Sequence, residues 1–315
     1  MTERDCVTFG ETMALLYAQP TVPLAHATAF TRSIAGAESN LAIGLARLGH
    51  RVGWFGRVGA DAFGTAVLGA LRAASVDVSR ARVDDAAPTG LLVRDSHPQR
   101  RISVLYYRDG SAGSRLGPED VDEEYVASAR MLHVTGITPA LSETALAATE
   151  KAVAIAKQHN VIVAFDPNLR TRLWSPADAA PVLQRLAADA DIVLVGHHEG
   201  ELLCGRPEAP AIAGWFGTGG QTVVVKQGAA GAWATDGERE WSADAHRVSV
   251  VDPVGAGDAF DAGYLSAVLH GHDVATALQH GCAAGALAVQ GPGDTDALPT
   301  REDLAAALDG TDIDR

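Results

Sequence analysis

Residues 252–263, Asp-Pro-Val-Gly-Ala-Gly-Asp-Ala-Phe-Asp-Ala-Gly, combine a glycine-rich turn with an acidic side chain. They follow the apolar run Val248–Val251, which predicts a strand, and they open an alanine-rich helical pattern that reaches about His270. The first N–H groups of a helix lack partners within it and the helix dipole is positive there, so this turn predicts an anion site. Asp258 would place a carboxylate beside that anion. An ordinary strand-to-helix connection with an acidic first turn remains the alternative.

Polar and glycine-rich residues also follow the other predicted strands. In a doubly wound sheet, ligands bind beyond the carboxyl ends of the strands. Each of these segments has a plain structural reading as a turn or a packing contact, but together they predict one polar rim. They are Glu11, Gly36–Asn40, Asp166–Arg170, His197–Glu201 and Lys226–Gly231.

Apolar strands alternate with amphipathic helices through most of the chain, which is typical of a parallel sheet buried on both faces. The predicted strands are Val7–Phe9, His50–Val58, Met131–Thr135, Val161–Phe165, Asp191–Val195 and Thr222–Lys226. The predicted helices include Asp61–Ala74, a helix capped by Ser142 and reaching His159, Pro176–Ala188, Gly257–His270, Val274–Val289 and Arg301–Leu308. No linker divides the chain, so residues 1–315 are predicted to form a single α/β domain.

Two segments, at about 12–33 and 88–109, show a period of two instead of a helical period. They predict a small separate β-sheet inserted into the α/β domain as a lid, with a hairpin turn at His97–Arg100. Alternate residues of a strand point to the same face, so Tyr106 and Arg108 are expected to face together and Tyr107 to point away.

The composition excludes several classes of function. A net charge of −14 disfavours binding to nucleic acid or to an anionic membrane. Cys6, Cys204 and Cys282 are odd in number and far apart, which favours core packing in a reducing compartment over disulfides. The amino terminus lacks the pattern of a signal peptide, and no apolar run is long enough for a membrane span. These features predict a cytoplasmic protein.

Two segments resemble the signatures of the ribokinase-like (PfkB) carbohydrate kinases. Ala35–Asn40, with Gly49 and Gly59, is similar to the first signature, and Asp252–Phe260 is similar to the more specific second one. The resemblance covers essentially the whole chain. It implies a ribokinase-like doubly wound sheet, mostly parallel and flanked by helices, with a small β-sheet lid.

Within that family the chain is most similar to the 2-keto-3-deoxygluconate kinases. Glu38 stands where the broader family usually has proline, and Tyr106–Ala112 and Asp166–Arg170, the latter followed by Leu-Trp, resemble sequences of this branch. Arginine presents a planar charged fork that matches a carboxylate, so Arg108 and Arg170 suit a sugar acid. The acids derived from gluconate and galactonate carry the same carboxylate, and both remain candidates.

The resemblance also implies roles for individual residues. Asp258 would be the general base, and the N–H groups of Gly255, Ala256 and Gly257 would bind the transferring phosphoryl group. The sugar acid would be held by Gly36, Asn40, Tyr106, Arg108, Arg170, Asp258 and Asp294. ATP would lie against Lys226, Gly228, Gly231, Gly255 and Gly257, with Mg²⁺ as its metal.

The chain departs from the family pattern at two places. After the strand ending at Val195 the family usually has Asn-x-x-Glu, and here His198 replaces the asparagine whereas Glu201 keeps the acid. His198 is therefore expected near the nucleotide and Glu201 near Mg²⁺. Pro253 stands where threonine is common, which puts in doubt a contact to the nucleotide or to a monovalent cation such as K⁺ that some members bind.

Three other functions compete with that of a sugar-acid kinase. A PfkB kinase for a neutral sugar such as fructose or ribose would not need the two arginines, and a non-catalytic sensor would not need Asp258. A dinucleotide-binding oxidoreductase is disfavoured because Gly-x-Gly-x-x-Gly is missing after the first strand. Leu92, Leu105 and Tyr107 predict an exposed lid face through which the chain would form a homo-oligomer.

Overall fold

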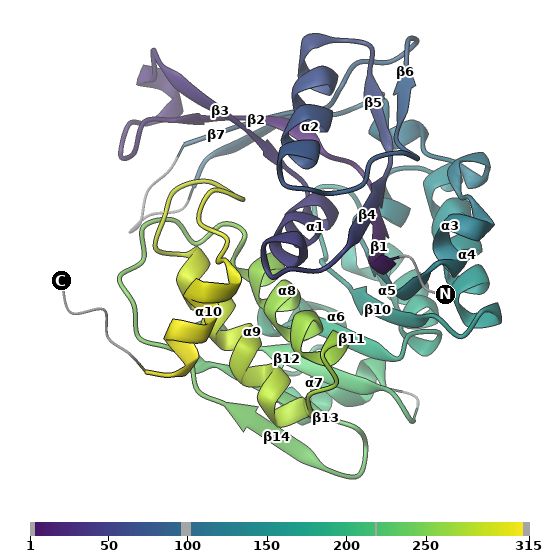
Figure 1. Cartoon of the computed structure of the whole chain (residues 1–315), viewed down its shortest axis with the longest axis vertical. Coiled ribbons are helices and arrows are strands. Elements are labelled where there is room, and N and C mark those ends of the chain that lie inside the picture. The colour runs from purple at the N-terminus through teal and green to yellow at the C-terminus, as the bar shows by residue number, and fades with distance from the viewer. Residues whose placement is uncertain (1–3, 96–101, 218, 311–315) are drawn as a thin grey trace.

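The computed structural model describes residues 4–95, 102–217 and 219–310, in which the main sheet has eight strands (Figure 1). Their spatial order is β14-β13-β12-β11-β10-β9-β1-β4. Neighbouring strands from β12 through β11, β10, β9 and β1 to β4 pair in parallel, and β13 and β14 continue the sheet as an antiparallel hairpin. The strands are β1 (Arg4–Phe9), β4 (Val52–Phe55), β9 (Ala129–Thr135), β10 (Ile162–Asp166), β11 (Ile192–Gly196), β12 (Thr222–Lys226), β13 (Ala232–Thr235) and β14 (Glu240–Ala243).

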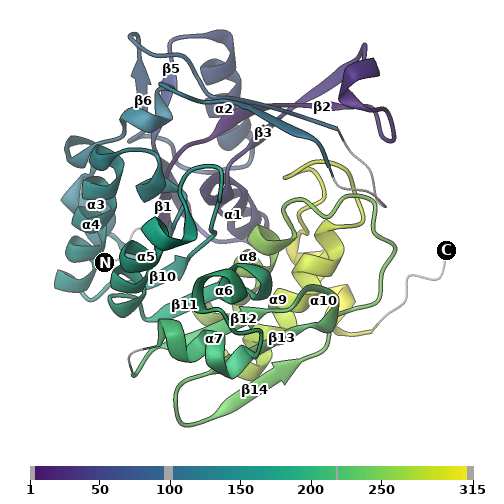
Figure 2. The same ribbon diagram turned by 180° about the vertical axis from the view of Figure 1, so that it is seen from behind.

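Helices cover both faces of the main sheet, as the continuous apolar strands require (Figure 2). One face carries α1 (Ala37–Arg47), α2 (Ala62–Ala73), α8 (Ala256–Leu269) and α9 (Val274–Ala288), with α10 (Arg301–Leu308) packed on α9. The other carries α3 (Glu123–Ala127), α4 (Glu143–Gln158), α5 (Pro176–Ala188), α6 (His197–Cys204) and α7 (Ala209–Phe216). Successive residues of a strand pack into the apolar cores on opposite faces of the sheet. Cys6 packs on the side of α8, and Val7 packs on the side of α4. The doubly wound, mostly parallel fold is confirmed.

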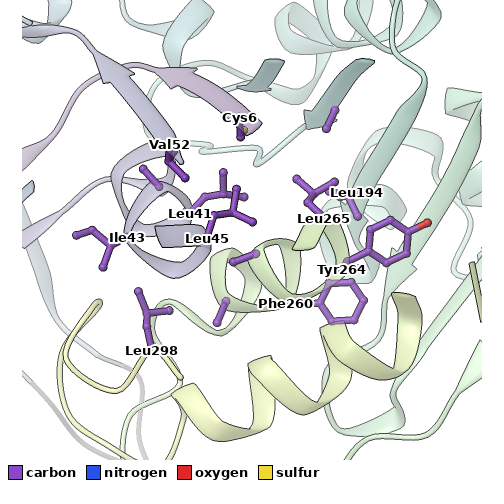
Figure 3. Close-up of a cluster of buried hydrophobic side chains, with 14 of the residues drawn as sticks. Cys6, Leu41, Ile43, Leu45, Val52, Leu194, Phe260, Tyr264, Leu265 and Leu298 are labelled. Carbon is purple, nitrogen blue, oxygen red and sulfur yellow. The ribbon is translucent and has the colours of Figure 1, made fainter. Parts of the chain in front are cut away.

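The core on the α8 side positions the helix that carries the glycine-rich turn. Figure 3 shows side chains of α1 and α8, among them Leu41, Leu45 and Leu265, gathered in one cluster with Cys6 of β1. Leu41, Leu45 and Leu265 are at most 1% exposed. This packing fixes the axis of α8 against the sheet, and so fixes where its first turn lies.

A second sheet of four strands lies apart from the main sheet (Figures 1 and 2). Its order is β3-β2-β7-β8, with bounds Phe30–Ala35, Met13–Ala18, Leu91–Arg94 and Val104–Tyr107. The predicted strands are therefore present, and the predicted turn His97–Arg100 lies outside the described residues. Leu105 and Tyr107 are exposed as expected, but the prediction for Leu92 was wrong, because Leu92 is buried with Met13 in the small apolar cluster of this sheet.

The predicted strand at Val248–Val251 was wrong. Val250 and Val251 are 45% and 39% exposed, and no described strand lies beside them. β14 is the edge of the main sheet, and from there the chain crosses to the helical face as an irregular segment. The N–H groups of Val251 and Asp252 donate to the carbonyl of Val289 at the end of α9. The β-branched residues favour an extended backbone here without a sheet partner.

The single strand predicted for His50–Val58 is two strands. β4 ends at Phe55, and β5 (Arg57–Gly59) leaves the main sheet to pair with β6 (Arg82–Asp84). The bend falls at Gly56, where a Cβ atom would lie 2.3 Å from the carbonyl oxygen of Gly10. The close approach of two backbones at this point accounts for the break.

No helix in the described ranges is both long enough and apolar enough to cross a membrane.

The close contact between α8 and α9 predicts that a larger side chain at Gly263 will destabilise the protein. A Cβ atom at Gly263 would lie 2.5 Å from the carbonyl oxygen of His280, a backbone atom that cannot move aside cheaply. We expect Gly263→Ala to lower the free energy of unfolding by about 1–3 kcal/mol, measured by urea denaturation. Gly69→Ala in α2 is the matched control, because nothing lies within 4 Å of its Cβ position. The control should be neutral or stabilising by about 0.5–1 kcal/mol, and equal effects of the two substitutions would contradict the packing argument.

Candidate active site

A cavity of about 1450 Å³ lies between the carboxyl ends of the main strands and the four-stranded sheet. Most of the residues singled out from the sequence line it. They are Gly36, Asn40, Tyr106, Arg108, Arg170, His198, Lys226, Gly228, Gly255, Ala256, Gly257, Asp258 and Asp294. Residues far apart in the sequence thus meet in one space, as the polar rim predicted.

Two of the predicted residues do not line the cavity. Gly231 opens β13, and its φ of 93° is in the region that favours glycine. A Cβ atom there would lie 2.0 Å from the carbonyl oxygen of Ala243, so the hairpin explains this glycine without a ligand. Glu201 also lies outside the lining, and the acidic residue of α6 that lines the cavity is Glu199.

The first turn of α8 has the geometry of an anion site. The helix begins at Ala256 after Gly255, whose φ is 83°. A side chain at Gly255 would strike the carbonyl oxygen of Asp294, 2.8 Å from the Cβ position. In the described part of the chain no backbone acceptor meets the N–H groups of Gly257 and Asp258. These two donors line the cavity at the positive end of the helix dipole.

Asp258 lies in that turn with the properties of a general base. Asn40 donates from Nδ2 to its Oδ2 at 2.7 Å. Burial, with a smaller contribution from nearby Asp166, raises the pKa of Asp258 to about 7, although Asn40, Arg170 and Lys226 act in the opposite direction. A carboxylate with a pKa near neutrality can accept a proton readily at physiological pH.

A buried lysine joins α8 to the sheet beneath Asp258. Lys226 Nζ lies 3.0 Å from both carboxylate oxygens of Asp261 and 3.3 Å from Oδ2 of Asp166. Burial by itself lowers the pKa of Lys226, but the carboxylates more than offset this effect and raise it. Asp261 was missed from the sequence. Its spacing of three residues from Asp258 places both on one face of the helix and could have signalled it.

Glu199 is the carboxylate that α6 contributes. It accepts the N–H groups of Leu169 at 2.6 Å and Gly196 at 2.5 Å. Burial raises its pKa to about 7, Asp166 adds to the rise, and Lys226 opposes it. Glu201, the acid that the sequence predicts near Mg²⁺, does not line the cavity, because α6 begins directly after β11 and its first turn, with Glu199, faces the cavity.

The two predicted arginines are in different electrostatic states. Arg108 pairs with Glu11, which is buried and also accepts from the Ser111 hydroxyl. Arg170 is exposed within the cavity lining and forms no salt bridge in the described ranges. Of the two guanidinium groups, the one still open to an incoming carboxylate is Arg170.

Tyr106 faces the same side as Arg108, as predicted. The Arg108 guanidinium carbon lies 5.8 Å from the centre of the Tyr106 ring, and that of Arg172 lies 5.5 Å from it. Arg172 also donates to the carbonyl of Val104 at 2.9 Å and so joins the loop after β10 to the four-stranded sheet. Two guanidinium groups therefore lie near the Tyr106 ring in the cavity lining.

Arg94 is a site residue that sequence reasoning missed. It lies at the end of β7 and its side chain is 1% exposed, yet it belongs to the cavity lining. Its NH2 group lies 2.8 Å from Oδ2 of Asp252 and 3.0 Å from Oδ1 of Asp294. Burial raises the pKa of Asp294 to about 6, although Arg94 opposes this shift. The period-two pattern ending at Arg94 was the signal available.

Comparison with known proteins agrees with this geometry. The pattern of the pfkB family carbohydrate kinases matches residues 3–301. The chain belongs to this family. Two curated relatives, both named 2-dehydro-3-deoxygluconokinase, come from Bacillus subtilis (strain 168) and Thermoproteus tenax. The first is 43% identical over 96% of this chain and 95% of its own length, and the second 38% over 96% and 94%.

One solved structure with a similar fold contains ATP and Mg²⁺. A putative ribokinase II from E. coli, determined in complex with ATP and Mg²⁺, superposes with a TM-score of 0.88 at 26% identity. The match covers 98% of this chain and 99% of that chain. As a pfkB kinase, this chain transfers a phosphoryl group from ATP to a sugar hydroxyl.

The raised pKa of Asp258 predicts a pH-dependent effect on stability. The folded state holds the proton of this carboxyl more tightly than the unfolded chain does. The contribution of this proton to the stability of the wild type is therefore lost as the pH rises from the unfolded pKa near 3.8 through about 7. We expect Asp258→Asn to raise the melting temperature, relative to wild type, more at pH 8 than at pH 5. Asp236→Asn, in an exposed turn where the pKa is lowered, should show no such difference. A pH-independent shift for Asp258→Asn would contradict the raised pKa.

Proposed function

We propose that this pfkB kinase phosphorylates the primary hydroxyl of 2-keto-3-deoxygluconate (also called 2-dehydro-3-deoxygluconate) to give the 6-phosphate. The observation that carries the proposal is one cavity lined by both Asp258, at the start of α8, and the guanidinium of Arg170, which forms no salt bridge with any described residue. The first suits phosphoryl transfer and the second suits a carboxylate on the acceptor. The names of the two relatives support the same substrate.

Asp258 would accept the proton of the sugar hydroxyl as it attacks the γ-phosphorus. Asn40 holds one carboxylate oxygen at 2.7 Å and so orients the other toward the cavity. The N–H groups of Gly255, Ala256 and Gly257 would receive the negative oxygens of the transferring group at the positive end of α8. Such fixed donors stabilise charge where it develops and need no reorganisation during the reaction.

The sugar acid would lie between the four-stranded sheet and the main sheet. Arg170 would receive its carboxylate, because Arg108 is already neutralised by Glu11. Arg108 would instead hold Tyr106 and close the cavity from above. Gly36, Asn40 and Asp294 would complete the contacts to the sugar.

ATP would enter along Gly228 and the start of α8. Lys226 points inward to Asp166 and Asp261, so its charge would act on the phosphates from beneath. The described residues contain no cluster of three or more metal-binding side chains. That fits Mg²⁺, which is usually held by phosphates, water and one or two carboxylates. Asp166 and Glu199 line the cavity and would be those carboxylates. The metal would neutralise charge on the phosphate oxygens.

A monovalent cation does not fit beside the turn. Asp252 is fully buried at its beginning, and the Arg94 guanidinium already occupies a position 2.8 Å from this carboxylate. A second cation at the same oxygen would be repelled. The proposed reaction therefore uses no K⁺ at Asp252.

The proposal extends to the organisation of the molecule. The four-stranded sheet would act as the lid of a single kinase domain spanning residues 1–315. Its edge strand β8 exposes Leu105 and Tyr107, by 46% and 62%, and these residues would meet a second copy of the chain. Because ATP is an intracellular metabolite, the cytoplasm is the expected compartment.

The proposed function is tested by coupled ADP release with ATP and Mg²⁺. The acceptors are 2-keto-3-deoxygluconate, its galactonate epimer, fructose, ribose and adenosine. We expect turnover with the sugar acids and a loss of kcat of about 10²–10⁴-fold in Asp258→Asn. Preference for a neutral sugar would overturn the substrate, and full activity of Asp258→Asn would overturn the base.

The two arginines should differ in their effects on substrate affinity. We expect Arg170→Ala to raise KM for the sugar acid by about 10–100-fold, as the loss of a charged hydrogen bond implies. Arg108→Ala should act less on KM, because its charge is spent on Glu11. Arg185→Ala, which removes a surface pair with Glu150, is the control and should leave KM unchanged. The assignment fails if Arg108→Ala raises KM more than Arg170→Ala does.

A further inference from the structure

Arg94 is among the largest fully buried side chains of the described residues, and it comes from the four-stranded sheet, not from the main sheet. A guanidinium in the protein interior is costly unless opposite charges and hydrogen bonds surround it. Here the compensating charges are Asp252 and Asp294, which belong to the opposite side of the cavity. Arg94 therefore spans the boundary between the two sheets.

Asp252 connects this guanidinium to the anion-binding turn. Its Oδ1 accepts the N–H of Val254 at 3.2 Å, inside the turn that leads to Gly255. Its Oδ2 accepts from Arg94 at 2.8 Å and from the N–H of Gly293 at 3.4 Å. One fully buried carboxylate thus ties the turn before α8 to the loop that carries Asp294.

The same loop contacts the turn through its backbone. The Cβ position of Gly255 lies 2.8 Å from the carbonyl oxygen of Asp294, so the backbones of the two residues are in close contact. A shift of Asp294 would therefore change the space around Gly255. A second residue of the four-stranded sheet reaches this loop, since the Tyr17 hydroxyl donates to Asp296 at 3.4 Å. The Arg94 guanidinium carbon lies 5.6 Å from the centre of the Tyr17 ring. The position of the turn and the position of the four-stranded sheet are therefore mechanically linked.

We propose that Arg94 is a positioning residue for phosphoryl transfer: as a built-in cation supplied by the four-stranded sheet, it holds Asp252 and Asp294 and so sets the anion-binding turn. This proposal rests on the proposed kinase function. It implies that the enzyme needs no bound monovalent cation at Asp252, because the guanidinium supplies that charge. It also implies that the turn reaches its working geometry only when the four-stranded sheet is docked.

The first test measures wild-type turnover in potassium, sodium and choline chloride at equal ionic strength. We expect the same kcat in all three salts, and the same melting temperature for the protein without substrate. A large loss of kcat in choline that potassium restores would overturn the proposal. The assay uses whichever acceptor the wild type phosphorylates, so absence of any turnover would count against the kinase function and not against Arg94.

The second test removes the guanidinium. We expect Arg94→Ala to lower kcat by about 10–100-fold, the cost of losing a charged hydrogen bond, with a smaller change in KM for the sugar. Added guanidinium or methylguanidinium should restore part of kcat, because the small cation can enter the space that the side chain vacates. Arg94→Lys should keep more activity than Arg94→Ala, since it keeps the charge but loses the planar fork.

Arg57→Ala is the matched control. Arg57 is also largely buried and pairs with three carboxylates, Asp84, Glu119 and Asp120, but it does not line the cavity. It should lose stability and keep kcat, and added guanidinium should not raise its kcat. If Arg94→Ala loses stability but keeps kcat, or loses kcat without rescue by guanidinium, Arg94 is only structural. If Arg94→Ala does not fold, Arg94→Lys and the salt series of the wild type still test the proposal. A normal kcat in Arg94→Lys together with a wild-type kcat that depends on potassium would contradict it.

Discussion

The cavity depends on one buried interaction, the ion pair of Lys226 with Asp261 and Asp166. These residues come from β12, α8 and β10, so the interaction joins two strands of the main sheet to the helix that covers them. Opposite charges that are largely buried are stable only when they stay together, so this pairing opposes a shift of α8. The helix start, and with it Asp258, is therefore held at the rim of the sheet. Apolar packing of α8 against α1 and α9 sets the axis of the helix, and the charges set its position along that axis.

Charge also joins the four-stranded sheet to the rest of the molecule. Arg108 reaches Glu11, Arg172 reaches the backbone of Val104, and Arg94 reaches Asp252 and Asp294. Polar links of this kind are directional, whereas the apolar cluster of the small sheet packs mainly on itself. A sheet held across a cavity by a few directional contacts can dock in one orientation and still separate from its partner. Such contacts would suit the proposed role of this sheet as a lid, because a lid must admit a substrate and then exclude water.

The outcome at particular residues shows what local patterns carry. The helix at 256–269 and its acidic first turn follow from the glycine turn and the apolar period, and the structure places them within one residue of the prediction. The strand predicted at Val248–Val251 was wrong. β-Branched residues favour an extended backbone, but a strand of a sheet also needs a neighbouring strand to pair with. Glu199 and Glu201 stand two residues apart on a short helix, so only the orientation of its first turn decides which one lines the cavity. Arg94 looked like the polar end of a lid strand, and its buried partners lie 158 and 200 residues away.

The sequence by itself determined the doubly wound fold, the small separate sheet, the pfkB family and the residue types gathered at the rim. Those properties depend on periodicity and on short motifs, which are local. Tertiary structure decided which charges remain available to a ligand. Arg108 pairs with Glu11, Lys226 pairs with Asp166, and Arg94 is buried between two acids. Arg170 forms no salt bridge in the described ranges. Electrostatic state depends on burial and on neighbours within a few ångströms, and in a doubly wound fold those neighbours come from distant parts of the chain.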